Sequence, residues 1–242
     1  MINKETFKLS IIIPCFNEKK TIEKILVRVD QSLKNYNILN YEILIVDDSS
    51  NDGTIEILKN LTKNDKIKVC FHEINLGKGA AIHTGLKYAT GDITIIQDAD
   101  LEYDPLDYEK LLRPFFEANA DIVYGSRFLG GGKYVRIHFF WHYLANKILT
   151  FICNLFVNLN LSDMETGYKV FRREIVNKFE IKEKRFGVEP ELAAKVGKLK
   201  PLPRIYEVGI SYYGRTYEDG KKIGWKDGLR ALYCIMKYKI FD

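Results

Sequence analysis

Residues 9–48 read LSIIIPCFNEKKTIEKILVRVDQSLKNYNILNYEILIVDD, and this stretch decides the fold class. Leu9–Ile13 is a β-branched run that ends at Pro14, which is typical of a strand buried on both faces. Thr21–Leu33 is expected to be a helix because its apolar residues recur at helical spacing, namely Ile22, Ile25, Leu26 and Val29. Tyr41–Val46 is a second apolar run of strand length. The stretch therefore predicts a strand, a helix and another strand in succession.

The same alternation continues through the first half of the chain. Patterns of the same kinds predict strands at Ile67–Phe71, Asp92–Gln97 and Asp121–Gly125, and helices at Thr54–Leu61, Gly79–Ala89 and Pro105–Asn119. Strands and helices that alternate with short connections imply an α/β fold with an open, mostly parallel sheet and helices on both faces. Because such sheets bind ligands beyond the carboxyl ends of their strands, a site is expected at residues 14–18, 47–50 and 98–102.

The second half of the chain has a different pattern. Phe139–Leu161 is dense in aromatic and aliphatic residues and has helical periodicity. Further elements are expected as a helix near Glu189–Gly197, a strand at Arg204–Ser211 and a last helix at Trp225–Tyr238. We interpret residues 128–242 as a subdomain appended to the first half, within one domain that spans residues 1–242.

Composition places the chain among ordinary folded proteins. It has 242 residues, of which 46% are hydrophobic and 29% charged, so it can bury a large core. The formal net charge of +5 is compatible with either a nucleotide or a phospholipid surface as partner and does not distinguish between them. We expect no nucleic-acid partner.

The cysteines and the apolar runs indicate the compartment of the protein and whether it spans a membrane. The four cysteines, at positions 15, 70, 153 and 234, form no paired motif and read as buried thiols in a reducing compartment. The start of the sequence does not resemble a secretory signal. Ile148–Val157 is the nearest approach to a membrane span and is half the length needed. An integral membrane protein is therefore not expected, whereas a protein bound to a membrane surface is compatible with these features.

Acidic residues gather where two of the predicted strands end. Asp47 and Asp48 follow one strand, and Asp98, Asp100 and Glu102 follow another. Carboxylates collected at one sheet edge repel one another unless a cation lies among them, and oxygen ligands with substrate phosphates are the usual way to hold Mg²⁺ or Mn²⁺. The alternative for residues 47–53 is a turn or helix cap, since this segment is rich in turn formers. The segment at Lys78 lacks the spacing of a P-loop.

Several motifs in order resemble glycosyltransferase family 2. They are SIIIPCFNE at 10–18, IVDDSSNDGT at 45–54, NLGKGA at 75–80, QDAD at 97–100, GSR at 125–127 and EVGISYYGR at 207–215. Within the family the chain looks like the dolichyl-phosphate mannose synthases and related polyprenyl-phosphate hexosyltransferases. The resemblance runs through nearly the whole chain and implies a GT-A fold.

The resemblance also implies roles for the residues at the strand ends. The nucleotide-sugar donor would contact Pro14, Phe16, Glu18, Val46, Asp48, Asp98, Ala99, Asp100, Lys184, Arg215 and Lys221. A divalent cation would be bound by Asp98, Asp100 and Glu102, of which the last is often Gln in related synthases. Catalysis is expected of Asp98, Asp100, Arg127 and Arg215, because cations near a leaving diphosphate stabilise its growing charge. For Lys184 the alternative is a solvated surface lysine.

The acceptor region is expected in the second half. The resemblance points to Arg127, Asp163 and Glu165 as acceptor contacts, and to amphipathic helices at Phe139–Leu161 that lie in a membrane interface. His138, His142 and Lys147 are expected to substitute for an arginine of the related synthases that this chain lacks. The related synthases carry an arginine there for the acceptor phosphate, and no arginine lies between Arg136 and Arg172. Two alternatives stay open, a helix cap for Asp163 and a buried helix pair for this segment.

The expected activity is transfer of a hexose, first of all mannose, from a nucleotide-diphosphate sugar to a polyprenyl phosphate, with inversion at the anomeric carbon. Residues 1–127 would bind donor and metal, and residues 128–242 would face the acceptor and the membrane, on its cytoplasmic side. Alternatives are glucosyl transfer from UDP-glucose, and transfer to a glycan hydroxyl with Glu165, Glu189 or Glu191 as general base. A non-catalytic module that binds a nucleotide sugar is a further alternative.

Overall fold

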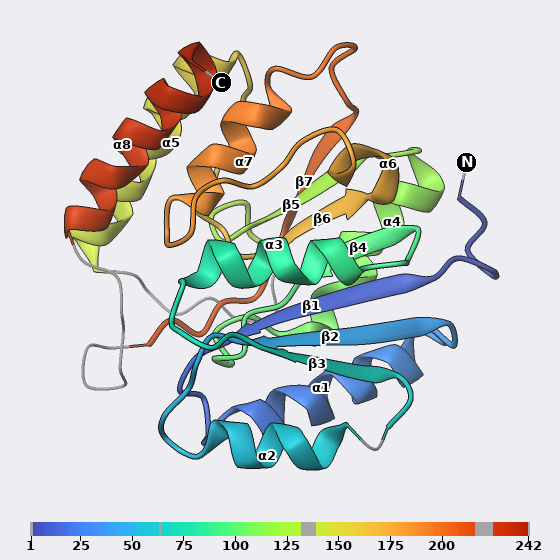
Figure 1. The fold of residues 1–242 in the computed structure, drawn as a ribbon. Coiled ribbons are helices and arrows are strands. Elements are labelled where there is room, and N and C mark those ends of the chain that lie inside the picture. Colours follow the sequence, from blue (N-terminus) through green and yellow to red (C-terminus); the bar gives the residue numbers. More distant parts are fainter. Residues whose placement is uncertain (1, 63, 132–138, 216–224, 242) are drawn as a thin grey trace.

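The computed structural model describes residues 2–62, 64–131, 139–215 and 225–241 (Figure 1). Within them one seven-stranded sheet runs in the order β3-β2-β1-β4-β6-β5-β7. The strands are β1 Leu9–Cys15, β2 Tyr41–Asp47, β3 Ile67–Phe71, β4 Ile93–Ile96, β5 Ile122–Ser126, β6 Lys169–Arg172 and β7 Ile205–Gly209. All neighbours pair in parallel except β6, which is antiparallel to both β4 and β5. The mostly parallel α/β sheet expected from the sequence is confirmed.

Helices cover both faces of this sheet, as predicted. They are α1 Ile22–Asn35, α2 Thr54–Leu61, α3 Lys78–Tyr88, α4 Tyr108–Glu117, α5 Phe140–Val157, α6 Arg173–Val176, α7 Val188–Val196 and α8 Trp225–Ile240, with a 3-10 turn η1 at Pro105–Asp107. One core packs residues of α1, α2 and α4 against the sheet, and a second core packs residues of α3, α5, α7 and α8 against it. In Figure 1, α1 and α2 lie below the sheet and α3 above it.

The sequence did not predict β6. This strand has four residues, and its two ends are the basic residues Lys169 and Arg172, so no apolar run marks it. Both side chains are nevertheless buried. The guanidinium of Arg172 donates to the backbone oxygen of Ala120 and to Oδ1 of Asn119, at 2.6 Å each. Because β6 and β7 join the sheet of the first half, residues 128–242 contribute to the same core as residues 1–127.

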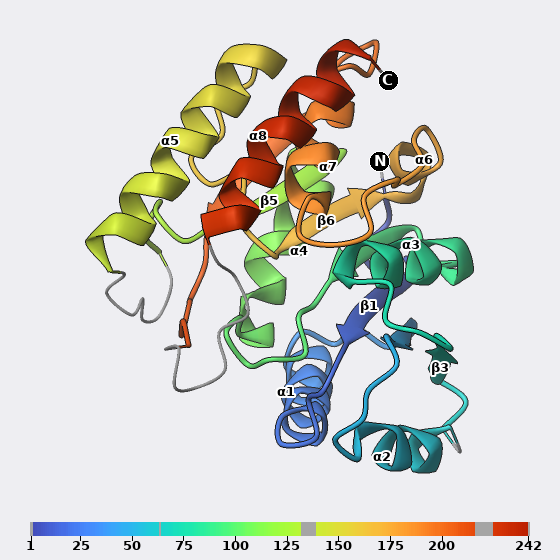
Figure 2. The same ribbon diagram turned by 60° about the vertical axis from the view of Figure 1, so that its left-hand side comes forward.

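Three helices of the second half lie together beside the sheet. Figure 2 shows α5 and α8 side by side with α7 next to α8, and these contacts are present between the elements. The single helix α5 occupies most of the predicted helical segment 139–161 and ends at Asn158, which adopts a left-handed conformation with φ of 57°. Across the described ranges, no helix has both the length and the apolar character needed to cross a bilayer.

Candidate active site at the carboxyl edge of the sheet

The strands β1, β2 and β4 end next to one another, because β1 pairs in parallel with both neighbours. The segments that follow them carry Phe16–Glu18, Asp48 and Asp98–Glu102. The sheet therefore brings together three of the segments that the sequence placed at a ligand site. Val46 and Ala99 are buried within this edge, whereas Pro14 and Phe16 are partly exposed.

Asp98 is paired with a lysine that the sequence analysis had not assigned to the site. The Nζ of Lys78 lies 2.9 Å from Oδ1 and 3.0 Å from Oδ2 of Asp98, and 3.0 Å from Oε1 of Glu189. Burial alone would lower the pKa of Lys78, but the two carboxylates outweigh it and raise the pKa above its usual value. Lys78 is the first residue of α3, so the start of this helix delivers a fixed positive charge to Asp98.

Arg215 gathers the other acidic groups of this edge. Its Nη2 lies 3.0 Å from Oε1 of Glu18 and 3.1 Å from Oδ2 of Asp100. Its backbone nitrogen donates to Oε1 of Glu102 at 2.6 Å, and Oε2 of Glu102 accepts a hydrogen bond of 2.9 Å from the hydroxyl of Tyr212. Glu18, Asp100 and Arg215, which the sequence predicted for one site, thus lie together.

Arg127 and Asp163 form a buried ion pair. Nε and Nη2 of Arg127 each donate to one oxygen of Asp163 at 2.7 Å, and the backbone nitrogen of Arg127 donates to the same carboxylate at 3.1 Å. Burial opposes the charge on Arg127, but Asp163 raises its pKa well above the usual value. Asp163 lies in the irregular segment between α5 and β6 and begins no helix, so the helix-cap alternative for this residue is wrong.

Lys147 lies close to this pair. Its Nζ donates to the backbone oxygen of Ser162 at 3.1 Å and lies 4.3 Å from the centre of the ring of Phe128. Arg127 and Phe128 are adjacent, as are Ser162 and Asp163, so two of the predicted acceptor cations share one neighbourhood. His142 packs near the ring of Phe139 at the start of α5. His138 lies outside the described residues, as does Lys221.

Glu165 is a further acidic group, close to Glu189 and Lys169. Burial, followed by the charge of Glu189, raises the pKa of Glu165, and burial lowers the pKa of Lys169. The ammonium of Lys169 donates to the backbone oxygen of Thr166. In the described part of the chain, Oε1 of Glu165 and Oε2 of Glu189 are buried without a hydrogen-bond partner. Glu165 is therefore held in surroundings that favour its neutral form.

Asp48 organises the loop that leads into α3. Its carboxylate accepts hydrogen bonds from the backbone nitrogens of Leu76 at 2.9 Å and Gly77 at 2.6 Å, and Nδ1 of His72 lies 2.8 Å away. Both oxygens are thus engaged within the chain, and the assignment of Asp48 to the nucleoside stays a prediction. His72, which also contacts Thr84, was missed because a single histidine carries no spacing signal.

Asp47 and Asp52 form hydrogen bonds within the segment 47–54, as the alternative of a turn or helix cap predicted for residues 47–53. Oδ2 of Asp47 accepts from the nitrogen of Ser50 at 3.0 Å, and Oδ1 of Asp52 accepts from the nitrogen of Thr54 at the start of α2 at 3.0 Å.

The side chain of Lys184 is exposed, and its backbone oxygen accepts from the nitrogen of Ala80 at 3.0 Å. Its role in binding the donor stays a prediction.

The carboxylates at this edge suit a divalent cation bound together with phosphates. Asp98 and Asp100 are partly exposed, and an incoming cation would share them with Lys78 and Arg215, which already pair with them. Mg²⁺ is commonly bound through one or two carboxylates plus substrate phosphates and waters. The described residues contain no cluster of three or more His, Cys, Asp or Glu side chains that could hold an ion alone. The aspartate pair therefore fits a cation that arrives with its substrate.

Gly167 leaves room for Asp98, and a larger residue there is expected to disturb the site. A Cβ at this position would lie 2.5 Å from Oδ2 of Asp98 and 2.8 Å from Cε2 of Tyr103. We expect Gly167→Ala to lower the free energy of unfolding by about 1–3 kcal/mol and turnover by about 10²-fold through the displaced carboxylate. Thermal unfolding and turnover measure the two effects.

A matched control is Gly228→Ala in α8, where a Cβ meets nothing within 4 Å. This change is expected to leave turnover unaltered and to stabilise the helix by about 0.5–1 kcal/mol. Turnover of the Gly167 variant equal to that of the control would show that Asp98 needs no such clearance.

The mixed sheet with its order of strands, its helices on both faces and its acidic edge defines the GT-A class of glycosyltransferases. The sequence pattern described as glycosyl transferase family 2 matches residues 10–179. The chain belongs to glycosyltransferase family 2.

Curated relatives agree with this membership. The chain is 31% identical over 234 residues to a dolichol-phosphate mannosyltransferase of Pyrococcus furiosus, an alignment that covers 96% of this chain and 64% of that enzyme. The chain thus spans slightly less than two thirds of the length of that relative. It is also 31% identical over 250 residues to an uncharacterised protein of Methanocaldococcus jannaschii, covering 99% of this chain and 95% of the relative.

Solved structures show the same fold at lower identity. Glucosyl-3-phosphoglycerate synthase from Mycobacterium tuberculosis, in complex with Mn²⁺, UDP and phosphoglyceric acid, matches with a TM-score of 0.73 at 18% identity, over 99% of this chain and 81% of that one. The same enzyme with Mg²⁺ and UDP matches with a TM-score of 0.70 at 19% identity, over 97% and 80%.

Proposed function

We propose that this chain transfers a hexose, first of all mannose, from a nucleotide-diphosphate sugar to a polyprenyl phosphate at a membrane surface, with inversion at the anomeric carbon. The observation that carries the proposal is a wide apolar face on α5 and α8 that no other part of the described chain covers, next to the cations Arg127 and Lys147. The likeness to a dolichol-phosphate mannosyltransferase supports the same acceptor.

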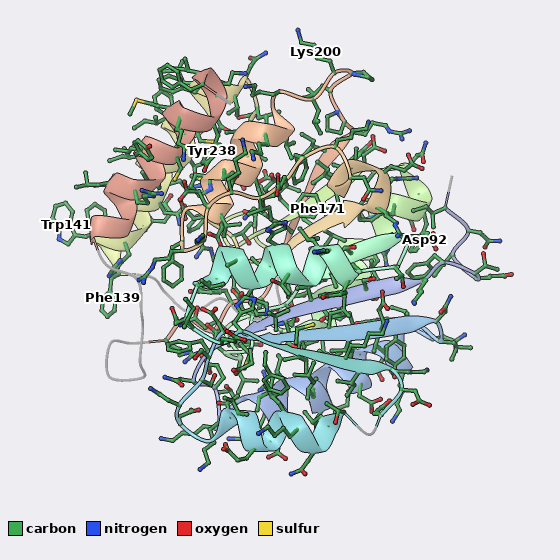
Figure 3. All side chains as sticks on the ribbon, in the orientation of Figure 1. Asp92, Phe139, Trp141, Phe171, Lys200 and Tyr238 are labelled. Atoms are coloured by element: carbon green, nitrogen blue, oxygen red, sulfur yellow. The ribbon has the colours of Figure 1, made fainter. Side chains whose placement is uncertain are left out.

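The apolar face consists of one stripe on each helix. On α5 and just before it the exposed residues are Phe139, Phe140, Trp141, Tyr143, Ile148, Phe151 and Leu155, and on α8 and just after it they are Leu229, Tyr233, Met236, Ile240 and Phe241. Figure 3 shows Phe139 and Trp141 at the edge of the molecule, pointing away from the sheet. Single exposed apolar residues are ordinary, whereas a contiguous face of this kind marks an interaction surface.

The charges around this face favour lipid headgroups. Helix α5 carries one lysine and no acidic residue. Residues 228–241 carry Arg230, Lys237 and Lys239 and no acidic residue, and the first two of these cations pair with Glu183. Apolar residues flanked by cations bind the boundary between headgroups and acyl chains of anionic membranes. A lipid surface would therefore cover the face and present a polyprenyl phosphate beside Arg127 and Lys147. His138, His142, Asp163 and Glu165 complete the acceptor residues that we assign.

The acidic edge supports a donor that brings a diphosphate and a divalent cation, Mg²⁺ or Mn²⁺. Asp98 and Asp100 would hold the cation, and Glu102 would join them if it released one of its bonds to residues 212–215. Bound there, the cation would stabilise the charge that grows on the leaving diphosphate. The M. tuberculosis structures with UDP and Mn²⁺ or Mg²⁺ support this pairing.

Cationic side chains of the chain would bind the diphosphate together with the divalent cation. Lys78 and Arg215 lie beside the two aspartates and are placed to contact phosphate oxygens, for which the fork of an arginine is well suited. Lys184 and Lys221 are assigned to the same groups by their positions in the sequence. The nucleoside is assigned to Pro14, Phe16, Glu18, Val46 and Asp48, with Ala99 next to the metal ligands.

A phosphate nucleophile suits the carboxylates of this site better than a hydroxyl does. A phosphate monoester has a second pKa near 6, so its oxygen is already anionic at neutral pH and needs no general base. Of the three base candidates, Glu191 is fully buried and accepts from the nitrogens of Lys182 and Glu183 at 2.7 Å each. Glu189 is paired with Lys78, and burial favours neutral Glu165. Glu191 and Glu189 are thus poorly placed to take a proton, and Glu165 is mostly protonated at neutral pH because burial raises its pKa to about 8.

We place the enzyme on the cytoplasmic face of its membrane. In the described part of the chain, Cys15, Cys70, Cys153 and Cys234 form no disulfide, which suits a reducing compartment.

A transfer assay tests the proposal. GDP-mannose or UDP-glucose is supplied with Mn²⁺ to the protein, together with polyprenyl phosphate in vesicles, with free mannose and glucose, or with phosphoglycerate. Transfer to the polyprenyl phosphate, abolished when the cation is chelated, is the expected result. Transfer confined to a soluble hydroxyl acceptor would overturn the proposed acceptor. If neither donor were consumed with any of the acceptors, the proposed transferase activity would be overturned.

The apolar face also predicts a binding defect. Trp141 has 75% of its surface exposed, and burial of such a side chain in an interface contributes about 1.5–3 kcal/mol. Trp141→Glu and Phe151→Glu are each expected to reduce partitioning onto anionic vesicles about tenfold or more, as measured by cosedimentation. Leu39→Glu, at 74% exposure in the connection between α1 and β2, makes the same kind of change elsewhere and should have no effect. Equal loss in all three variants would refute the assigned face.

A further inference from the structure

Helix α8 packs in the second hydrophobic core and also bonds to one buried carboxylate. Glu183, in the connection between α6 and α7, has a side chain that is 4% exposed. Arg230 donates to its Oε2 from Nη2 at 2.6 Å and from Nε at 3.1 Å, and the hydroxyl of Tyr238 donates to its Oε1 at 2.7 Å. Nζ of Lys237 lies 3.4 Å from the same Oε1. Three residues spread along α8 thus converge on Glu183.

These bonds keep Glu183 ionised. Burial alone would raise the pKa of this carboxyl, but the bonds from Arg230 and Tyr238 outweigh burial and lower the pKa. Its backbone is fixed as well, because Glu191 of α7 accepts hydrogen bonds from the nitrogens of Lys182 and Glu183. The segment 182–184 therefore has little freedom to move independently of α7 and α8.

The opposite side of this segment packs directly on the start of α3. The backbone oxygen of Lys184 accepts from the nitrogen of Ala80 at 3.0 Å. A Cβ at Gly77 would overlap the backbone oxygen of Lys184, and a Cβ at Gly79 would overlap the backbone oxygen of Glu183. The two glycines thus allow backbone to lie against backbone, with no side chain between to absorb a shift.

Lys78 lies between these two glycines. Its ammonium bridges Asp98 and Glu189, and the nitrogen of the preceding Gly77 donates to Asp48. A displacement of residues 183–184 would therefore move the start of α3 and, with it, the cation beside Asp98. The contacts run without a break from α8 to the acidic edge of the sheet.

The other side of α8 carries the apolar stripe Leu229, Tyr233, Met236 and Ile240. The ring of exposed Tyr233 lies 5.0 Å from the guanidinium carbon of Arg230 and 5.6 Å from Nζ of Lys237. The cations that bond Glu183 are thus also in contact with a residue of the lipid-facing stripe. Burial of Tyr233 in a headgroup layer would restrict the same two side chains.

We propose that Glu183 is a positioning residue that couples the docking of α8 on a lipid surface to the placement of Lys78 beside Asp98. The inference rests on the proposed function, which supplies both the lipid surface and the donor. It adds that the two binding events favour each other. Because such coupling is reciprocal, vesicles should raise the affinity for a nucleotide diphosphate by the factor by which the nucleotide raises the affinity for vesicles.

The test measures the affinity for UDP and for GDP, each with Mn²⁺, by calorimetry with and without vesicles of phosphatidylcholine and phosphatidylglycerol. No acceptor is added, and binding to vesicles is measured separately by cosedimentation. For the unaltered protein we expect vesicles to lower the Kd of the preferred nucleotide by about fivefold or more. In Glu183→Gln and in Arg230→Gln this ratio should fall to near one, while cosedimentation falls no further in either variant than in Lys239→Gln, which removes one cation from the same helix.

Arg230→Gln is the safer of the two variants for folding, because half of the Arg230 side chain is exposed. Lys239→Gln removes the same charge from the same helix and serves as the matched control, with the ratio of the unaltered protein expected. A ratio that stays high in both Glu183→Gln and Arg230→Gln, even with a lower melting temperature, would show a structural role only and overturn the coupling.

Two further outcomes separate this inference from the proposed function. If the unaltered protein binds vesicles and transfers to polyprenyl phosphate, but its affinity for nucleotide does not change with vesicles, the coupling is refuted and the function stands. If the protein does not bind vesicles at all, both the lipid-facing surface and the coupling fail together.

Discussion

Asp98→Asn is expected to reduce hexose transfer by about 10²–10³-fold. The carboxylate of Asp98 pairs with Lys78 and would bind the divalent cation beside the diphosphate, and asparagine keeps its shape while removing the charge. The same variant should bind Mn²⁺ more weakly in the presence of UDP or GDP, which calorimetry measures independently of turnover. Its melting temperature should change little, since Asp98 is partly exposed and Lys78 keeps Glu189 as a partner.

The matched control for this prediction is Asp104→Asn. Asp104 caps the turn η1 through a bond from the nitrogen of Leu106, and asparagine caps equally well. Turnover and Mn²⁺ affinity should both stay at the level of the unaltered protein. Normal Mn²⁺ binding by Asp98→Asn would remove this carboxylate from the metal site, whatever its effect on turnover.

The parallel half of the fold could be predicted because its strands are continuous apolar runs. Leu9–Ile13 and Tyr41–Val46 are buried in the sheet as expected, since strands covered on both faces need apolar residues throughout. Strand β6 could not be found in this way. Its Lys169 and Arg172 are buried at the centre of the sheet only because backbone and side-chain oxygens elsewhere in the chain satisfy them.

For the candidate site too, the sequence located individual residues but not the contacts between distant segments. Motifs located Asp98, Asp100 and Arg215, but pairing between Arg215 and Asp100 depends on how two distant segments meet. Lys78 was overlooked because the sequence was tested there for a P-loop, whereas the structure uses the first residue of α3 to place a single ammonium. Asp48 could be located as a strand-end carboxylate, but its bonds to Leu76 and Gly77 could not be foreseen.

The second large effect is expected on stability, from Asp163→Ala. Asp163 is fully buried and accepts two charge-assisted bonds from Arg127. Removal of one partner of a buried ion pair leaves an uncompensated charge and costs about 3–5 kcal/mol of unfolding free energy. For a chain of this length the melting temperature should fall by roughly 6–20 °C. Glu109→Ala breaks an exposed pair with Arg113 and should change the free energy by less than about 1 kcal/mol.

The double variant Arg127→Met, Asp163→Leu distinguishes stability from function at this pair. Replacement of both charges by apolar side chains removes the uncompensated charge, so the double variant should be more stable than Asp163→Ala. Recovery should be partial, because the backbone nitrogen of Arg127 also loses its acceptor. Under the proposed function, hexose transfer should nevertheless stay low, since the cation assigned to the acceptor phosphate is gone. A double variant with normal transfer would mean that Arg127 serves only the fold, and the acceptor phosphate would then need another cation.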